Sequence, residues 1–149
     1  MREYEQGVCE RCGEVFPYYL VHCGFSECSY AYCERCGKTA LLSFWNPAWR
    51  ELGIPELQQR ARHQEIPSEL EPYLLPCACG GVFKSGTGPR CPECNELLSA
   101  EQAATYIERN ASGAQKGWRW QRNWYGLCCI VVAGNMVEDN FKRRGILRV

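Results

Sequence analysis

Histidine, aspartate and long apolar runs are scarce in this sequence, and each scarcity argues against a class of protein. The 149 residues include two histidines and a single aspartate, Asp139, so Ser-His-Asp hydrolysis has almost no candidate residues. No glycine-rich phosphate loop is present. The longest apolar stretch, residues 127–133, is far shorter than the roughly 20 residues that span a bilayer. We therefore expect no membrane protein, and no small-molecule substrate is evident.

The first residues, Met-Arg-Glu-Tyr-Glu-Gln-Gly, lack the apolar core of a signal peptide. We therefore expect a cytoplasmic protein. In a reducing compartment, closely spaced cysteines are more often metal ligands than disulfides.

The chain also has no formal net charge at neutral pH, because its 17 Lys and Arg residues balance its 17 acidic residues. The charges are uneven along the chain: residues 1–112 carry ten basic residues and 15 glutamates, whereas residues 113–149 carry seven basic and two acidic residues. Affinity for nucleic acid rests on many phosphate contacts, so a neutral total argues against a general nucleic-acid binder.

What the chain has in excess is cysteine, with 12 in all. Six lie in residues 1–45 and four in residues 77–94, with a cysteine-free stretch between them. This content in a short chain without an export signal is typical of metal-binding modules. The separation of these cysteines into two groups predicts two such modules.

The second module holds the clearest metal site. It contains Cys77-Ala-Cys79-Gly-Gly and Cys91-Pro-Glu-Cys94, with 11 residues between Cys79 and Cys91. Two pairs in tight turns supply the four tetrahedral ligands that zinc prefers, and glycine and proline suit such turns. The segment resembles the zinc-ribbon superfamily, in which two knuckles joined by a hairpin hold one structural zinc, although Cys-x-Cys replaces Cys-x-x-Cys at the first knuckle. We predict one zinc site at Cys77, Cys79, Cys91 and Cys94.

The first module contains two near copies, Cys9-Glu-Arg-Cys12-Gly and Cys33-Glu-Arg-Cys36-Gly. Each has the form of a zinc knuckle, a tight turn that presents two thiolates to one metal. Alternative sets would use Cys23 and Cys28, but the four-residue gap between these lacks the glycine after the second thiol. We predict a second zinc site at Cys9, Cys12, Cys33 and Cys36.

Residues 22–36 read His-Cys-x4-Cys-x4-Cys-x2-Cys, a run that resembles ZZ-type cross-brace fingers, in which an inner pair helps to hold a second metal. The resemblance implies a third zinc through Cys23 and Cys28, with His22 among the residues available to complete it. The alternative is a pair of buried free thiols.

The sequence gives little support for an enzyme. Catalytic zinc keeps an open position and usually has histidine or carboxylate ligands, whereas four thiolates close a site. The deaminase pattern of His-x-Glu with Pro-Cys-x-x-Cys is not matched, because His63-Gln-Glu65 lies too near Cys77. Cys128 and Cys129 are adjacent in a predicted strand, so they point to opposite faces and suit core packing better than chelation. We therefore expect no catalytic residues.

The fold expected is α+β, with two zinc-stabilised modules, short helices and a C-terminal antiparallel β-hairpin. Its divisions are listed in chain order: a first zinc module (1–45), a helical and proline-rich connector (46–72), a zinc ribbon (73–98), and a helix with the hairpin (99–149).

Local patterns place the elements within these divisions. Apolar spacing predicts a short helix over residues 47–63 that is interrupted near Gly53 and Pro55. Ser99-Ala-Glu-Gln102 has the form of a capping box and predicts a helix to about residue 109. An apolar run at 127–132, a turn at 133–135 and residues 136–141 predict the hairpin.

The segment Lys116-Gly-Trp-Arg-Trp-Gln-Arg-Asn-Trp-Tyr125 combines tryptophan with arginine. In an extended strand its alternate side chains would share one face. Such a face can anchor a protein interface, stack nucleobases, or close the core of a small domain. The partner-binding residues that we predict are Trp118, Arg119, Trp120, Arg122 and Trp124.

Closed thiolate sites and an acidic body lead to one expectation of function. We predict a non-enzymatic protein with two zinc ions that binds a protein partner, as a regulatory adaptor or as the cognate inhibitor of a toxin. The alternative is an RNA- or DNA-binding zinc-ribbon protein that uses the tryptophan-rich segment.

Overall fold

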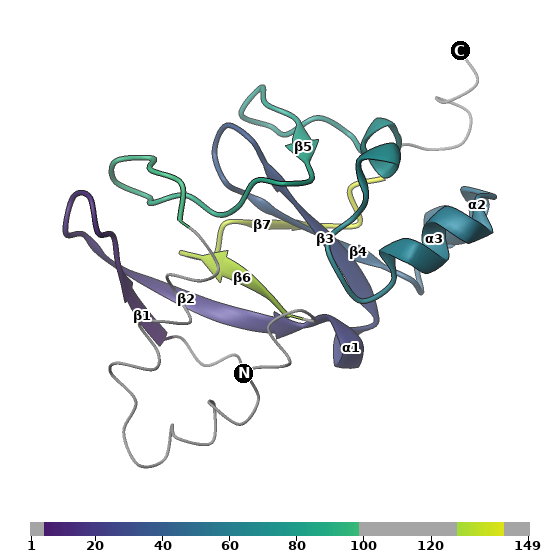
Figure 1. Ribbon diagram of the computed structural model, residues 1–149, viewed down its shortest axis with the longest axis horizontal. Coiled ribbons are helices and arrows are strands. Elements are labelled where there is room, and N and C mark those ends of the chain that lie inside the picture. Colours follow the sequence, from purple (N-terminus) through teal and green to yellow (C-terminus); the bar gives the residue numbers. More distant parts are fainter. Residues whose placement is uncertain (1–4, 99–127, 142–149) are drawn as a thin grey trace.

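The computed structural model describes residues 5–98 and 128–141, which form two β-sheets with short helices at one end (Figure 1). The strands are β1 (Glu5–Val8), β2 (Val15–His22), β3 (Cys28–Cys33), β4 (Thr39–Ser43), β5 (Phe83–Lys84), β6 (Cys128–Val132) and β7 (Met136–Glu138). The helices are α1 (Cys23–Ser26), α2 (Pro47–Glu51), α3 (Pro55–Ala61) and the 3-10 helix η1 (Ser68–Tyr73). The expected α+β class is confirmed.

One sheet has the strand order β1-β2-β6 and is antiparallel, and the other has the order β5-β3-β4-β7. Within the second sheet, β3 pairs antiparallel with β4 and β5, whereas β4 and β7 are parallel. The turn between β1 and β2 and the turn between β3 and β4 therefore belong to different sheets. This separation decides which cysteines can meet.

Strand β2 is buried on both faces, which explains its run of aromatic and aliphatic residues. Phe16 and Tyr18 face one cluster of buried side chains, and Tyr19 and Val21 face another that also takes residues from β3, β4 and β6. Because successive side chains of a strand point to opposite faces, the first sheet lies between these two clusters. The second cluster also fills the space between the two sheets.

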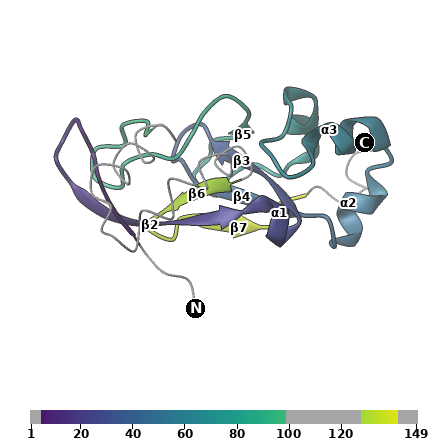
Figure 2. The ribbon, with the colours of Figure 1, turned by 60° about the horizontal axis from the view of Figure 1, so that its bottom comes forward.

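A third cluster lies on the other side of the second sheet, where the helices cover it. Trp49 of α2, Ala61 of α3 and Leu70 of η1 are buried there against β3 and β4. Asn46 caps α2 by accepting from the Ala48 amide at 2.8 Å, and Pro47 begins the helix. Figure 2 shows α2 and α3 together at the end of the molecule away from the β1–β2 turn.

The expected interruption of the helix over 47–63 is confirmed. Two helices form, and Gly53 lies between them with a positive φ of 66° that ends the first. Residues 68–73, expected as a connector, instead form η1.

The C-terminal strands exist, but the expected hairpin between them is wrong. The turn at 133–135 is present, with the Asn135 amide donating to the Val132 carbonyl at 2.9 Å. However, β6 pairs with β2 in one sheet and β7 pairs with β4 in the other. The turn therefore joins the two sheets instead of closing a hairpin.

Several predictions lie outside the described residues. These are the helix over 99–109 and the partner-binding residues Trp118, Arg119, Trp120, Arg122 and Trp124. Within the part of the chain that the structure describes, no helix has both the length and the apolar character needed to cross a membrane.

Candidate metal centres

The first knuckle forms the turn between β1 and β2. After Cys12 the chain turns back at Gly13, whose amide donates to the Cys9 carbonyl at 2.8 Å. Gly13 has a φ of 76°, a conformation that glycine adopts without steric cost. The turn leaves both sulfurs on one side, with Cys9 buried and Cys12 exposed.

The second knuckle repeats this geometry in the turn between β3 and β4. The Gly37 amide donates to the Cys33 carbonyl at 3.0 Å, and Gly37 has a φ of 75°. The Arg35 amide also points at the Cys33 sulfur, 3.4 Å away, which suits a thiolate.

The third and fourth knuckles lie on the long segment after η1. Gly80 (φ 95°) donates to the Cys77 carbonyl at 2.9 Å, so Cys-x-Cys forms a turn of the same kind with one residue fewer. Asn95 (φ 61°) takes the place of glycine in the fourth knuckle and donates to the Cys91 carbonyl at 3.0 Å. Asparagine tolerates this left-handed conformation better than most residues.

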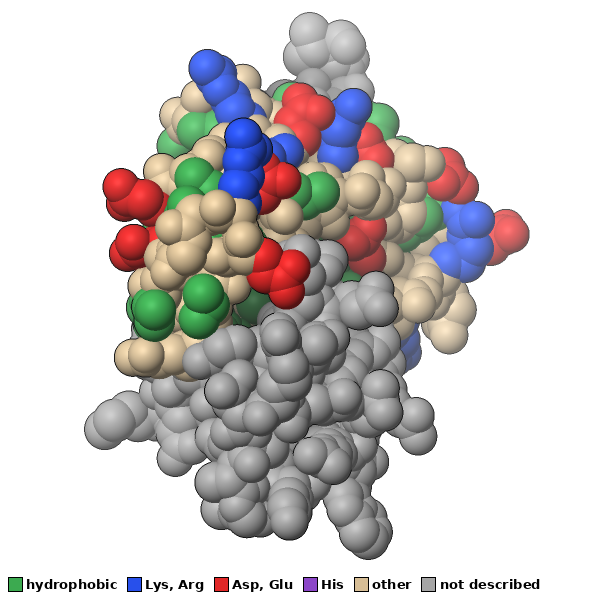
Figure 3. Space-filling model, turned by 60° about the vertical axis from the view of Figure 1, so that its left-hand side comes forward, with side chains coloured by type: hydrophobic (Ala, Val, Ile, Leu, Met, Phe, Trp, Pro, Cys, Tyr) green, Lys and Arg blue, Asp and Glu red, His purple; other side chains and the backbone are tan. Residues whose placement is uncertain are grey.

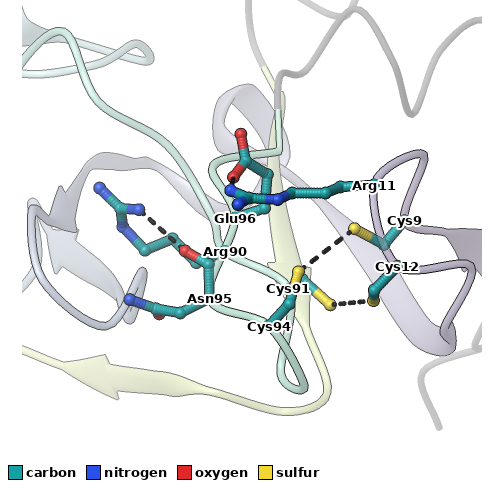
Figure 4. Close-up of polar contacts among 8 residues, drawn as sticks. All are labelled: Cys9, Arg11, Cys12, Arg90, Cys91, Cys94, Asn95 and Glu96. Atoms are coloured by element: carbon teal, nitrogen blue, oxygen red, sulfur yellow. Dashed lines mark hydrogen bonds and ion pairs between the residues drawn. The ribbon is translucent and has the colours of Figure 1, made fainter.

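The first and fourth knuckles face each other and form site I (Figure 4). The sulfurs of Cys9 and Cys94 are 3.7 Å apart, and those of Cys12 and Cys91 are also 3.7 Å apart. All four ligand atoms lie within 4.8 Å of one another. Four sulfurs around one metal at about 2.3 Å would be about 3.8 Å apart, so the group fits a tetrahedral ion.

The second and third knuckles form site II in the same way. The sulfurs of Cys33 and Cys79 are 3.5 Å apart, and those of Cys36 and Cys77 are 3.6 Å apart. Strand β5 causes this meeting, because its pairing of Phe83 with Cys33 lays the third knuckle beside the second. Gly81 is required at the contact, since a Cβ there would lie 2.9 Å from the Cys33 sulfur.

All eight cysteines predicted as ligands lie in these two groups, but the predicted pairing of knuckles is wrong. The sequence predicted that the first knuckle shares a metal with the second and that the third shares one with the fourth. The first two are hairpin turns of different sheets, so they cannot meet, and each binds a knuckle of the 77–94 segment instead. Neither 1–45 nor 73–98 makes a metal site by itself. The sites are nested, with site II inside the chain segment that site I closes.

The two sites are joined through the second and fourth knuckles. Arg90 donates from Nε to the Glu34 carbonyl at 3.1 Å, and Asn95 donates from Nδ2 to the Arg35 carbonyl at 3.1 Å. Gly37 packs so closely that a Cβ there would lie 2.4 Å from the Arg90 nitrogen. A change in one site therefore reaches the other through direct contacts.

Without metal, the thiols of each quartet differ in pKa. In site I, backbone amides led by that of Cys12 lower the pKa of Cys9 to about 7. The Glu14 amide works in the same direction at Cys12, but desolvation and the neighbouring thiols prevail and raise its pKa to about 12. In site II, the Gly81 amide lowers the pKa of Cys79 to about 7, and burial raises that of Cys77 to about 12. Cys9 therefore ionises more readily than Cys12, and Cys79 more readily than Cys77.

The remaining cysteines with described side chains lie in the core. Cys23, Cys28 and Cys129 are buried together in the cluster between the sheets. Within the described side chains, neither Cys23 nor Cys28 belongs to a group of three or more metal-capable residues. The side chain of His22, which could complete a third zinc site, lies outside that part, so the third zinc stays a prediction. His63 is likewise in neither quartet, and its ring lies 5.5 Å from that of Phe44.

Comparison with known proteins places these sites in a family. The model of a family described as "Domain of unknown function (DUF8255)" matches residues 5–100. The chain belongs to this family. All eight cysteines of the two quartets lie in the DUF8255 region, whereas β6 and β7, which complete the two sheets, lie beyond it. The searches of curated proteins and of solved structures found no match.

Proposed function

We propose that this chain is a non-enzymatic zinc-binding protein in which two structural zinc ions shape a surface for a protein partner. One observation carries the proposal: eight cysteines form two compact quartets of sulfur ligands with tetrahedral spacing. Binding of metal by such quartets supplies folding energy, because the sites do not exist in the unfolded chain.

Zinc is the metal that suits these sites best. Soft thiolate ligands in a closed tetrahedron select zinc or iron–sulfur chemistry, and zinc has no geometric preference to satisfy beyond the tetrahedron itself. The knuckles hold each pair of sulfurs by backbone hydrogen bonds rather than by long flexible side chains. The metal content of the purified chain, measured by mass spectrometry of the elements, should be two zinc per chain.

The proposal that the chain is not an enzyme is supported by the ligands. A quartet of thiolates leaves no coordination position for water or substrate, and no histidine or carboxylate belongs to either quartet. Substitution with Co²⁺ tests this feature. The visible spectrum should be that of a tetrahedral four-thiolate site and should not change on addition of cyanide. A spectrum that shifts with cyanide would reveal an open position and contradict the structural role.

A protein partner is favoured over nucleic acid by the distribution of charge. Among the described side chains coloured on the face in Figure 3, basic and acidic groups are interspersed and form no broad basic patch. Residues 1–112 carry more glutamates than basic residues, which opposes contact with a row of phosphates. For the contacts themselves we propose the tryptophan and arginine residues at 118–124, since these side chain types dominate protein interfaces.

Affinity capture with the zinc-loaded chain tests the partner. The captured protein should be lost when the metal is removed and when Trp118, Trp120 and Arg122 are replaced by alanine. A matched binding assay with a ten-nucleotide single-stranded RNA should show no association at low salt. RNA binding that disappears in the same triple variant would overturn the protein-partner proposal in favour of nucleic acid.

A further inference from the structure

An open hollow lies beside α2 and α3, at the other end of the molecule from the β1–β2 turn of site I (Figure 1). It has a volume of about 390 Å³, within the range of pockets that hold a ligand or a few partner side chains. Its lining includes Phe44, Trp49, Pro55, Arg50, Gln59 and Arg62. Figures 1 and 2 agree that α2 and α3 lie at the opposite end of the molecule from the β1–β2 turn of site I.

The aromatic part of this hollow is fixed in place. The ring centroids of Phe44 and Trp49 are 4.9 Å apart, and those of Trp49 and Phe141 are 5.9 Å apart. Trp49 is buried, and Gln58 binds the chain at both ends of the turn by donating to the Trp49 carbonyl and accepting from the Ile54 amide. The apolar surface is therefore preformed and needs little reorganisation to bind.

Two arginines at the hollow have no carboxylate partner within the described part of the chain. The Arg62 guanidinium lies over the Phe44 ring, 5.6 Å from its centroid, and Arg50 is exposed on α2. Arg60, which lies on α3, is by contrast paired with Glu69. An arginine stacked on an aromatic ring keeps its N–H groups free to bind an anion in the plane of the guanidinium. The hollow thus has two arginines in its lining whose charge no acidic residue of the described chain neutralises.

We propose that this hollow binds an acidic residue and an adjacent apolar side chain of the protein partner. The arginines match a carboxylate, and the surface of Phe44, Trp49 and Pro55 matches an aliphatic or aromatic group. Trp45, the next residue along the chain from Phe44, is 67% exposed. A nucleic acid would instead bring a row of phosphates against a surface rich in glutamate, so a peptide is favoured.

This proposal rests on the proposed function, because it names part of the surface that a partner would use. The two are separable in experiment, since Arg50 and Arg62 belong to neither quartet. If capture of the partner depends on zinc but not on these arginines, the proposed function stands and this site is refuted.

Selection from a displayed library of random 12-residue peptides tests the site. The bait is the full zinc-loaded chain, and the counter-selection uses the Arg50→Gln, Arg62→Gln double variant. We expect enrichment of peptides that carry Asp or Glu next to an aliphatic or aromatic residue, with binding at least about tenfold weaker to the double variant. The matched control, Arg60→Gln on α3, changes an arginine that is paired with Glu69 and should bind as the wild type does.

Three outcomes would overturn the proposal. The first is no enrichment over the double variant, and the second is enrichment of peptides without an acidic residue. The third is a ten-nucleotide oligouridine that binds the wild type and loses binding in the double variant, which would assign the hollow to nucleic acid. Zinc content and thermal unfolding of each variant, expected to match the wild type, show that any loss of binding is local.

Discussion

Gly13 and Gly37 occupy the same position in two nearly identical knuckles, yet their surroundings differ. Both have φ near 75°, at 76° and 75°. A Cβ on Gly13 would meet nothing within 4 Å, whereas a Cβ on Gly37 would collide with Arg90. Gly13→Ala should reduce the free energy of unfolding by about 1–2 kcal/mol through backbone strain alone. Gly37→Ala should reduce it by roughly 1–3 kcal/mol more, because the fourth knuckle must move.

Denaturant unfolding of the zinc-loaded variants measures both effects, with Gly13→Ala as the control for strain. Equal losses of stability in the two variants would contradict the close packing of the second knuckle on the fourth.

The thiol pKa values predict how metal affinity depends on pH. Cys9 and Cys79, with pKa about 7, are partly ionised at neutral pH, whereas Cys12 and Cys77, at about 12, are protonated and must lose their protons to bind metal. The pKa values of Cys94 in site I and Cys33 in site II are also raised, so each site holds at least two protonated thiols at neutral pH. Each metal therefore displaces two or more protons, and acidification favours the metal-free chain. Zinc affinity should fall by about a hundredfold or more per pH unit between pH 8 and pH 6.

Competition with a chromophoric chelator, corrected for the protonation of the chelator itself, measures this slope. An affinity that stays constant from pH 8 to pH 6 would show that the zinc is not held by these thiols.

At the scale of residues the sequence was most informative, because the residues that form a knuckle follow one another in the chain. A pair of cysteines followed by glycine, as in Cys9-x-x-Cys12-Gly13, is recognisable within five residues, and all eight quartet cysteines were predicted. The pairing of knuckles could not be read in the same way. The likeness of the segments around Cys9 and Cys33 reflects their common role as hairpin turns, not a shared metal.

At the scale of elements, side chains of the second sheet form hydrogen bonds with the backbone of β6, an edge strand of the first sheet. The Tyr32 hydroxyl donates to the Ile130 carbonyl and accepts from the Ile130 amide, both at 2.9 Å. Tyr32→Phe would leave that buried amide unpaired and should reduce the free energy of unfolding by about 1–3 kcal/mol. Tyr73→Phe is the control, because the Tyr73 hydroxyl has no hydrogen bond to the described residues. Thermal unfolding compares the two, and a Tyr32→Phe protein as stable as the control would contradict the contact between the sheets.

The existence of elements was easier to predict than their partners. The apolar run before residue 133 predicted β6, and Gly53 with Pro55 predicted the division of α2 from α3. The assignment of β6 to β2 and of β7 to β4 depends on pairings between distant segments, which no local pattern encodes. A tight turn such as that at 133–135 normally closes a hairpin, and here it joins two sheets instead.

At the scale of the whole molecule, the nested sites should bind metal cooperatively. Their shared contacts, from Arg90 and Asn95 to the second knuckle, are made well only when both sites are ordered. Removing site II with Cys36→Ser and Cys77→Ser should therefore weaken zinc binding at site I by about tenfold, and the Cys12→Ser, Cys94→Ser variant should weaken site II by the same factor, because coupling is reciprocal.

Asn95→Gly separates coupling from ligation. Asn95 already has a φ of 61°, so glycine keeps the backbone while removing the hydrogen bond to Arg35. Calorimetric titration of zinc into this variant should give two sites with weaker coupling. Independent sites in the wild-type chain would contradict the account of how the second and fourth knuckles join them.

The central claim is that two metals are held in nested quartets, the first knuckle with the fourth and the second with the third. The most direct measurement is a ¹H–¹¹³Cd correlation spectrum of the cadmium-substituted chain, which connects each metal to the β-protons of its own cysteines. We predict one cadmium correlated with Cys9, Cys12, Cys91 and Cys94, and another correlated with Cys33, Cys36, Cys77 and Cys79. A cadmium correlated with all four of Cys77, Cys79, Cys91 and Cys94 would contradict the nested arrangement.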